Sequence, residues 1–120
     1  MDRAELGRYG EDLAAQHLEG SGYTLLDRNW RCARGELDLV ALAPDGTVCF
    51  VEVKTRSGTG YGVPSEAVTR LKATRIHRLA MTWLGDHRPE GHRGALRFDV
   101  VSIVRRRGFA PVLTHLEGAF

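Results

Sequence analysis

The amino-acid sequence predicts an α/β fold in which a central mixed sheet is flanked by helices. Three features lead to this class: helical periodicity over residues 2–20, two β-rich runs joined by a tight turn between residues 36 and 54, and a second helical segment before the last two strands. The chain has 120 residues, which is within the usual size of one domain. We therefore expect residues 1–120 to form a single domain.

The first helix is expected from about Asp2 to Gly20, because apolar residues recur at helical spacing and Asp2 with Glu5 can cap the first turn. Glycine and serine at residues 20–22 end this helix, and residues 23–29 have the composition of a first strand. Residues 30–34 are interpreted as a basic connection to the next strand.

The centre of the chain is predicted to be a β-hairpin. Residues 36–43 and 47–54 are β-rich, and Pro44, Asp45 and Gly46 between them provide turn chemistry. Residues 55–64 are rich in glycine, serine and threonine and lack periodicity, so they predict a loop beside the hairpin.

A second helix is expected to end near Leu84, with Ser65 or Thr69 as its N-cap. Residues 97–104 and 112–116 are predicted to be the last two strands, which gives the order αβββαββ. Because a helix separates the third and fourth strands, a right-handed crossover would join them if they are parallel neighbours. This arrangement predicts a mixed sheet.

The composition argues against several classes of protein. No apolar run approaches the roughly 20 residues that span a bilayer, and the first residues lack the hydrophobic segment of a signal peptide. We therefore expect a cytoplasmic protein without membrane contact. Cys32 and Cys49 stand alone, so neither a disulfide framework nor a zinc ribbon is indicated. The net charge of +2 is too small to demonstrate nucleic-acid binding by itself.

Charged residues interrupt both strands of the predicted hairpin. Alternate side chains of a strand face the same way, so Glu36 projects together with Asp38. For the same reason, Glu52 projects together with Lys54 from the neighbouring strand. A charge within an otherwise apolar strand is unfavourable unless it is paired or bound to a metal ion. These four positions therefore require an explanation.

Two interpretations of these charges are open. In the first, one face of the hairpin is solvated, and Asp38, Glu52 and Lys54 form ordinary cross-strand ion pairs. In the second, Asp38 and Glu52 converge on Mg²⁺ or Mn²⁺, which prefer oxygen ligands, and Lys54 stands beside the metal-bound water. Phosphodiester hydrolysis needs this set of groups, because a metal ion neutralises the phosphoryl oxygens and a cation orients the nucleophile.

The spacing between Asp38 and the triplet Glu52-Val53-Lys54, after a helix that carries Glu11, resembles that of the PD-(D/E)XK nuclease superfamily. Leu37 stands where the name of the superfamily has a proline, which is often absent from relatives. Four segments resemble the bacterial YraN-like family more narrowly: YGE at residues 9–11, RGELDLV at 34–40, FVEVKTR at 50–56 and RFDVV at 97–101.

The resemblance implies a restriction-endonuclease-like fold, with archaeal Holliday-junction resolvases among the nearer structural relatives. It also implies a set of roles: Asp38 and Glu52 as metal ligands, the Val53 carbonyl as a third ligand, Lys54 as the catalytic lysine, and Glu11 as the acid that completes the cluster. Glu36 matches the family motif and is a secondary candidate without an assigned role. Taken without the resemblance, Glu11 reads as a solvated residue at the border of an apolar helix face.

Four basic residues are expected to contact nucleic acid: Arg31, Arg56, Lys72 and Arg75. Phosphate contacts dominate nucleic-acid affinity, and Lys72 and Arg75 lie on one helix from which they could reach phosphates. The alternative for these two is a basic outer stripe that faces only water.

The leading hypothesis is a metal-dependent nuclease that uses Mg²⁺ or Mn²⁺ and acts on DNA, including branched or otherwise structured DNA. DNA is favoured over RNA as the partner, and a homodimer is an open option because a two-fold enzyme can cut two strands symmetrically. The alternative is a non-catalytic module that keeps the nuclease fold to bind nucleic acid or a protein.

Overall fold

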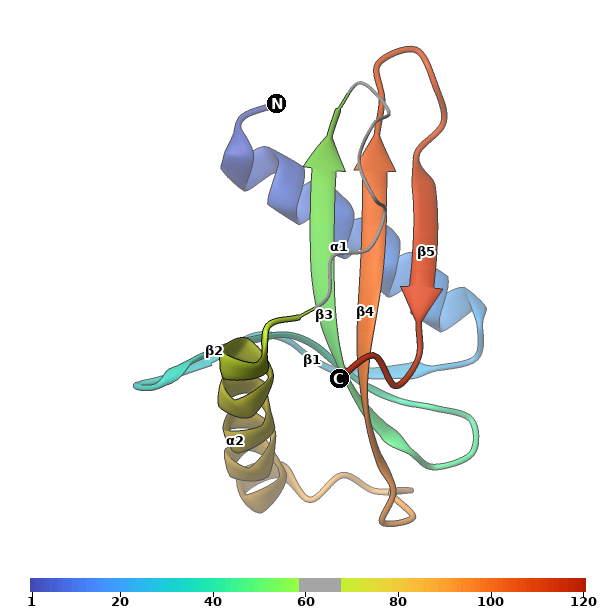
Figure 1. Cartoon of the computed structure of the whole chain (residues 1–120). Coiled ribbons are helices and arrows are strands. Elements are labelled where there is room, and N and C mark those ends of the chain that lie inside the picture. Colours follow the sequence, from blue (N-terminus) through green and yellow to red (C-terminus); the bar gives the residue numbers. More distant parts are fainter. Residues whose placement is uncertain (59–67) are drawn as a thin grey trace.

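The computed structural model describes residues 1–58 and 68–120, which form two helices and five strands (Figure 1). Along the chain the elements are α1 (Arg3–Gly20), β1 (Thr24–Cys32), β2 (Gly35–Leu42), β3 (Val48–Ser57), α2 (Arg70–His87), β4 (Leu96–Arg105) and β5 (Val112–Leu116). The predicted order αβββαββ is confirmed. Most of the expected loop after the hairpin, and the alternative N-cap Ser65, lie outside the described residues.

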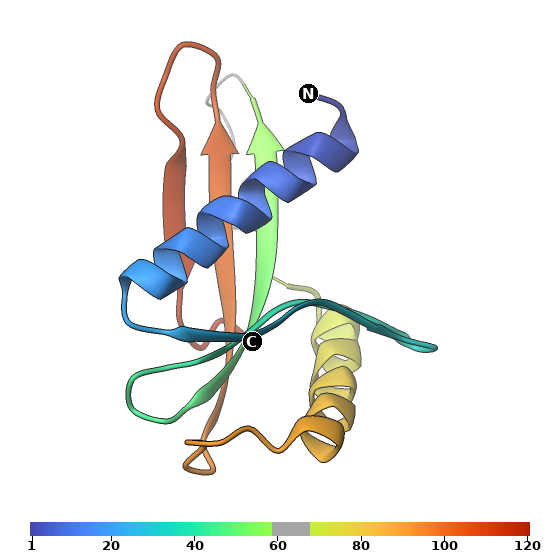
Figure 2. The same ribbon diagram turned by 180° about the vertical axis from the view of Figure 1, so that it is seen from behind.

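The five strands form one mixed sheet in the order β1-β2-β3-β4-β5. β3 and β4 are parallel, whereas the other neighbouring pairs are antiparallel. α2 lies between the two parallel strands along the chain, as a crossover requires. α1 covers one face of the sheet and α2 lies on the other, which is clear when the molecule is turned by 180° (Figures 1 and 2). The predicted α/β class, with helices flanking a mixed sheet, is confirmed.

The core has two layers because the strands present alternate side chains to the two helices. Towards α1, the strand residues Leu39 and Val51 pack with Leu18 of the helix. Towards α2, Val40 and Phe50 pack with a helical stripe made of Ile76, Leu79, Ala80 and Trp83. Phe50 and Trp83 meet edge to face with 5.9 Å between ring centroids, a favourable arrangement for aromatic rings.

Both helices begin at side-chain caps that the sequence contains. Asp2 accepts a hydrogen bond from the Glu5 backbone at 2.8 Å, and the Glu5 carboxylate accepts one from the Asp2 backbone at 3.3 Å. This confirms the expected capping pair. Thr69 caps α2 by accepting a hydrogen bond from the Lys72 backbone at 3.2 Å, so Thr69 is the N-cap of the two alternatives. In the described residues, neither helix is long and apolar enough to cross a membrane.

Two predicted connections are wrong. Most of residues 30–34 belongs to β1, which pairs with β2 as far as Cys32 opposite Gly35. Arg31 is accommodated there because its guanidinium pairs with Glu36 across the ladder at 2.9 Å. β3 likewise continues past residue 54 to Ser57, since β4 provides a parallel partner over its whole length. In both places the polar, exposed end of a strand has the composition of a loop.

Candidate metal site at the end of a β-ladder

The acidic site forms where β2 leaves β3. The last pair of the antiparallel ladder between these strands is Leu39 opposite Val51, so the neighbouring Asp38 lies just outside the ladder. Oδ2 of Asp38 accepts a hydrogen bond from the backbone N–H of Val53 at 2.9 Å. The carboxylate thereby satisfies a backbone donor that the departing strand no longer pairs. This bond fixes Asp38 against β3.

β1 has an unusual backbone conformation opposite this site. Asn29 has a backbone φ of 55°, a conformation that is uncommon for residues other than glycine. Its neighbours in register are Arg28 opposite Leu39 and Trp30 opposite Leu37, which places Asn29 across from Asp38. The hairpin formed by β1 and β2 projects beyond this point, past α2 (Figure 1).

Glu52 lies beside Asp38 and is the most buried acid of the site, with 7% of its surface exposed. Burial and the neighbouring charge of Glu52 raise the pKa of Asp38 to about 7, with a smaller contribution from the charge of Glu11. A hydrogen bond between the Asp38 and Glu52 side chains acts in the same direction, whereas the bond from the Val53 backbone opposes it. Burial and the charge of Glu52 therefore disfavour the ionised form of Asp38. Lys72 of α2 offsets part of this charge, with its Nζ 3.0 Å from Oε1 of Glu52.

Glu11 approaches the site because α1 lies unusually close to β3. The buried Gly10 faces Thr55, and a β-carbon at position 10 would come within 1.7 Å of the Thr55 hydroxyl oxygen. Only glycine allows this contact. The Glu11 carboxylate accepts a hydrogen bond from the Asn29 side chain at 3.2 Å and lies 3.7 Å from the guanidinium of Arg28. Glu11 therefore borders the site and is held by β1.

The residues after Glu52 occupy both faces of β3. Val53 turns its side chain towards the core beneath α1, while its backbone N–H binds Asp38. Lys54 is partly buried and lies opposite Ser102 in the parallel register with β4. By strand alternation it shares a face with Glu52. The sequence-predicted neighbours Asp38, Glu52 and Lys54 thus gather around the end of the ladder.

The carboxylates fit a hard divalent cation that keeps much of its hydration. In residues 1–58 and 68–120, no group of three or more acidic, histidine or cysteine side chains is arranged to hold an ion jointly. Asp38 and Glu52 nevertheless converge on one pocket of about 340 Å³, which Glu36, Lys72 and Arg75 also line. Mg²⁺ is commonly bound through one or two carboxylates and several waters. The donor chemistry of the pair matches this mode, with Glu11 outside the pair.

Glu36 and the expected nucleic-acid contacts Arg31, Arg75 and Arg56 lie in three parts of the structure. Glu36 and Arg31 form a cross-strand pair on the projecting hairpin, with side chains 49% and 77% exposed. An ion pair this exposed contributes little to stability. Arg75 lines the acidic pocket, and Arg56 is exposed near the end of β3.

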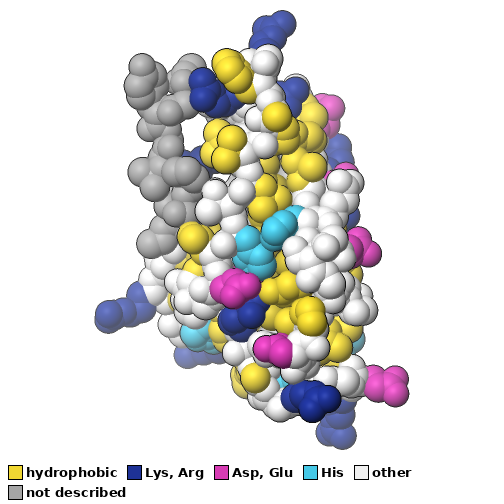
Figure 3. Space-filling model, turned by 90° about the vertical axis from the view of Figure 1, so that its right-hand side faces the viewer, with side chains coloured by type: hydrophobic (Ala, Val, Ile, Leu, Met, Phe, Trp, Pro, Cys, Tyr) yellow, Lys and Arg dark blue, Asp and Glu magenta, His cyan; other side chains and the backbone are white. Residues whose placement is uncertain are grey.

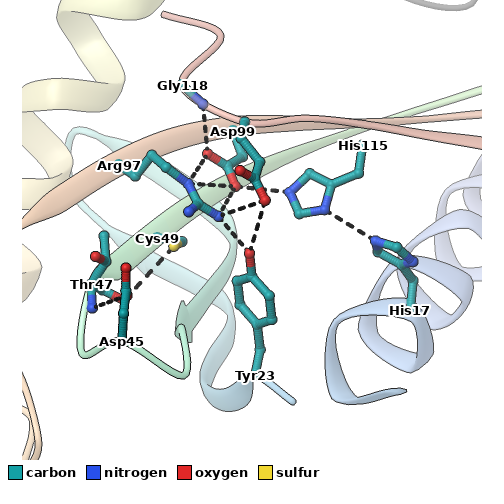
Figure 4. Close-up of polar contacts among 10 residues, drawn as sticks. His17, Tyr23, Asp45, Thr47, Cys49, Arg97, Asp99, His115 and Gly118 are labelled. Atoms are coloured by element: carbon teal, nitrogen blue, oxygen red, sulfur yellow. Dashed lines mark hydrogen bonds and ion pairs between the residues drawn. The ribbon is translucent and has the colours of Figure 1, made fainter. Parts of the chain in front are cut away.

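A second polar cluster was not identified as a site from the sequence (Figure 4). Asp99 of β4 is fully buried and accepts hydrogen bonds from Arg97 at 2.9 Å, from His115 at 2.8 Å and from the Gly118 backbone at 3.0 Å. The other ring nitrogen of His115 lies 3.0 Å from His17 of α1. Alternate charges at residues 97 and 99 in an apolar strand were the available signal, the same one that marks Glu52 and Lys54.

Both carboxylate oxygens of Asp99 accept hydrogen bonds. Burial alone would raise the pKa of Asp99, but the hydrogen bonds from His115, Arg97 and Gly118 outweigh it and lower that pKa. Burial, together with His115, lowers the pKa of His17. Histidine side chains reach the surface on the face that contains β5, among apolar and charged groups (Figure 3). The cluster joins β4, β5 and α1, so we interpret it as structural.

Together these features define an α/β protein with a mixed five-stranded sheet and a pair of converging carboxylates at the end of one of its ladders. The profile of the Uncharacterised protein family UPF0102 matches residues 10–103, and the chain belongs to this family. Membership of the bacterial YraN-like family, expected from the four motifs, is thereby confirmed.

Relatives match over nearly their whole length. The chain is 56% identical over 115 residues to a UPF0102 protein of Clavibacter michiganensis subsp. michiganensis, with 96% of this chain and 95% of that protein covered. It is 50% identical over 127 residues to a UPF0102 protein of Acidothermus cellulolyticus, covering 98% and 95%. A UPF0102 protein of Nocardia farcinica is 49% identical over 119 residues, covering 99% and 91%.

Proposed function

We propose that this protein is a metal-dependent nuclease of the PD-(D/E)XK type that hydrolyses phosphodiester bonds in DNA, with branched or otherwise structured DNA as its substrate. The observation that carries the proposal is the convergence of Asp38 and Glu52 on one pocket, where burial and the charge of Glu52 raise the pKa of Asp38 to about 7. Groups with strongly perturbed pKa values that line a pocket are typical of functional sites. The order of elements and the mixed sheet support a restriction-endonuclease-like fold.

In this proposal Asp38 and Glu52 hold Mg²⁺ or Mn²⁺, with the Val53 carbonyl as a further ligand. The bound ion would acidify a water molecule and neutralise charge on the phosphoryl oxygens. Asp38 must lose its proton to bind the ion, so binding strengthens as the pH rises through about 7. The Val53 N–H holds Asp38 in place throughout.

Lys54 supplies a positive charge on the face of β3 that carries Glu52. Its ammonium group orients the attacking water and stabilises the negative charge that develops on the phosphoryl group. Glu11, held by Asn29, adds negative potential beside Asp38 and so favours a divalent cation. Lys72, Arg75, Arg56 and Arg31 bind phosphates of the DNA.

The experiment compares cleavage of duplex, single-stranded and four-way-junction DNA in Mn²⁺. We expect Lys54→Ala and Asp38→Asn to lower the cleavage rate by roughly a hundredfold or more, because each removes a group that acts on the transition state. Asp45→Asn is the matched control, since Asp45 is an exposed carboxylate in the turn between β2 and β3, the two strands that carry Asp38 and Lys54. Equal activity of the wild type and Lys54→Ala would disprove the mechanism.

The same assays distinguish the alternative of a non-catalytic module. Absence of cleavage, combined with DNA binding that weakens steeply with salt, would assign the fold a binding role. The proposal also includes a homodimer for symmetric cleavage of two strands, which sedimentation velocity with and without junction DNA would measure.

A further inference from the structure

A basic pocket lies beside the acidic one, between α2 and the end of the hairpin formed by β1 and β2. It has a volume of about 400 Å³. Its lining consists of three arginines, two threonines and two leucines: Arg34, Arg75, Arg78, Thr74, Thr82, Leu71 and Leu79. The helical members recur three or four residues apart, so they form one stripe along α2. Arg34 faces this stripe from the hairpin.

The hairpin is held against α2 by contacts that a different sequence would not allow. Gly35 has a φ of 145°, and a β-carbon there would lie 3.3 Å from Cδ1 of Leu79. Glycine therefore lets the hairpin end approach the helix and brings Arg34 to the pocket. Further along, Trp83 donates a hydrogen bond to Asp27 of β1 at 2.9 Å. The position of Arg34 is thus set by packing of the hairpin on α2.

Among residues 1–58 and 68–120, no carboxylate lines this pocket, and none forms an ion pair with Arg34, Arg75 or Arg78. Three arginines outside the pocket do have carboxylate partners: Arg28 with Asp12, Arg31 with Glu36 and Arg97 with Asp99. Three converging guanidinium groups repel one another and attract anions. Guanidinium groups bind phosphate oxygens well, because their planar fork can donate two parallel hydrogen bonds.

The basic and acidic pockets share a wall. Arg34, Arg75 and Leu79 line both of them. A ligand that occupies both must present an anion to the arginines and a second anionic group to the divalent cation that Asp38 and Glu52 would hold in the proposed function. A nucleic-acid strand has this chemistry, because its phosphates repeat along the backbone. Adjacent phosphates of one strand would therefore occupy the two pockets that share this wall.

We infer that Arg34, Arg75 and Arg78 bind a backbone phosphate of a nucleic-acid strand whose adjacent phosphodiester lies over Asp38 and Glu52. The placement of the adjacent phosphodiester rests on the proposed nuclease function, whereas phosphate binding by the arginines does not require cleavage. The pocket holds the strand in register with the acidic site. Arg34 and Arg78 are positioning residues, and Arg75 contacts both parts of the strand.

The test measures binding of fluorescently labelled duplex, single-stranded and junction DNA by anisotropy in EDTA, over a series of salt concentrations. The double variant Arg34→Gln/Arg78→Gln should bind about tenfold more weakly. The slope of its log binding constant against log salt concentration should become less steep, by the equivalent of about two phosphate contacts. The matched control is Arg93→Gln/Arg107→Gln, which removes two exposed arginines outside the pocket. Arg34→Lys/Arg78→Lys should keep the wild-type salt dependence, because it keeps both charges.

Several outcomes would overturn the inference. Equal weakening in the pocket and control variants would mean that only total charge matters. Wild-type affinity in the pocket variant, or no DNA binding by the wild type, would remove the phosphate site. Displacement of DNA by polyglutamate as effectively as by unlabelled DNA would point to an acidic protein instead. Thermal unfolding of each variant controls for folding, and the lysine variant provides a second test.

These failures can be told apart from failure of the proposed function. Cleavage in Mn²⁺ that depends on Lys54, with no binding difference between the two glutamine variants, would leave the nuclease and remove the phosphate pocket. Binding that depends on Arg34 and Arg78, without cleavage of any substrate, would leave the pocket and remove the nuclease.

Discussion

Two aspartates of this protein are withdrawn from water on neighbouring parts of the same sheet, yet the protein treats them in opposite ways. Asp99 receives hydrogen bonds from Arg97, His115 and the Gly118 backbone, and its pKa is lowered. Asp38 receives one backbone hydrogen bond and faces Glu52, and its pKa is raised to about 7. Burial acts in the same direction on both. The difference comes from the neighbours, and it separates a carboxylate with several hydrogen-bond donors from the one that we propose as a cation ligand.

The largest expected effect is on the structural side of this comparison. Asp99→Asn should lower the free energy of unfolding by roughly 3–5 kcal/mol, because it leaves Arg97 without its buried partner. Urea unfolding at pH 7 measures this change. A loss below about 1 kcal/mol would mean that the cluster contributes little, and the contrast with Asp38 would disappear.

The two aspartates also predict opposite dependence of stability on pH. For Asp99 the folded pKa is below the unfolded value of 3.8, so its contribution is present above pH 3.8 and is lost as the pH falls through the folded pKa. For Asp38 the folded pKa of about 7 exceeds the unfolded value of 3.8. The folded state therefore binds this proton more tightly, and stability is lost as the pH rises from about 4 to 7.

Asp38→Asn should consequently stabilise the metal-free protein at pH 8, by on the order of 2–4 kcal/mol. The gain should shrink as the pH is lowered to 5, because the wild-type carboxyl is then mostly protonated. Urea unfolding in EDTA at the two pH values measures both quantities. Asp45→Asn, which changes an exposed carboxylate, is the control. A gain of equal size at both pH values would contradict the assigned titration.

A smaller effect is expected from the cation itself. At pH 8, Mn²⁺ should raise the free energy of unfolding of the wild type by about 1.4 kcal/mol at ten times its Kd and by about 2.7 kcal/mol at a hundred times. Asp38→Asn and Glu52→Gln should lose this response, because each removes a ligand. Thermal unfolding over a series of Mn²⁺ concentrations is the measurement. Stabilisation that persists in both variants would place the ion elsewhere.

The smallest expected effect lies at the rim of the Asp99 cluster. Glu117 approaches Arg97 at 3.6 Å, but its side chain is 59% exposed. Glu117→Gln should therefore change the free energy of unfolding by about 0.5 kcal/mol or less, since water already solvates this pair. A loss above about 1 kcal/mol in urea unfolding would show that the cluster depends on its exposed members as well as its buried ones.

The sequence predicts the elements of this fold well, because they follow from the periodicity of apolar residues and from local caps such as Thr69. It does not distinguish Asp38 from Asp99, since each is an acid in an apolar strand. The partners that decide their behaviour come from distant parts of the chain, such as Glu52 for one and His115 for the other. Pairing of Arg31 with Glu36 likewise requires the register of a hairpin, so residues 30–34 resemble a loop in sequence alone.

The contact between Gly10 and Thr55 has a mechanical consequence. Gly10 sets the distance between α1 and β3 at this point, because a methyl group on residue 10 would overlap the Thr55 hydroxyl. α1 is a continuous rod that carries Glu11 beside the acidic pair and, six residues later, His17 beside His115. Lifting the rod by the width of one methyl group would draw both side chains away from their neighbours at once. The absence of a side chain at Gly10 therefore keeps both Glu11 and His17 close to their partners.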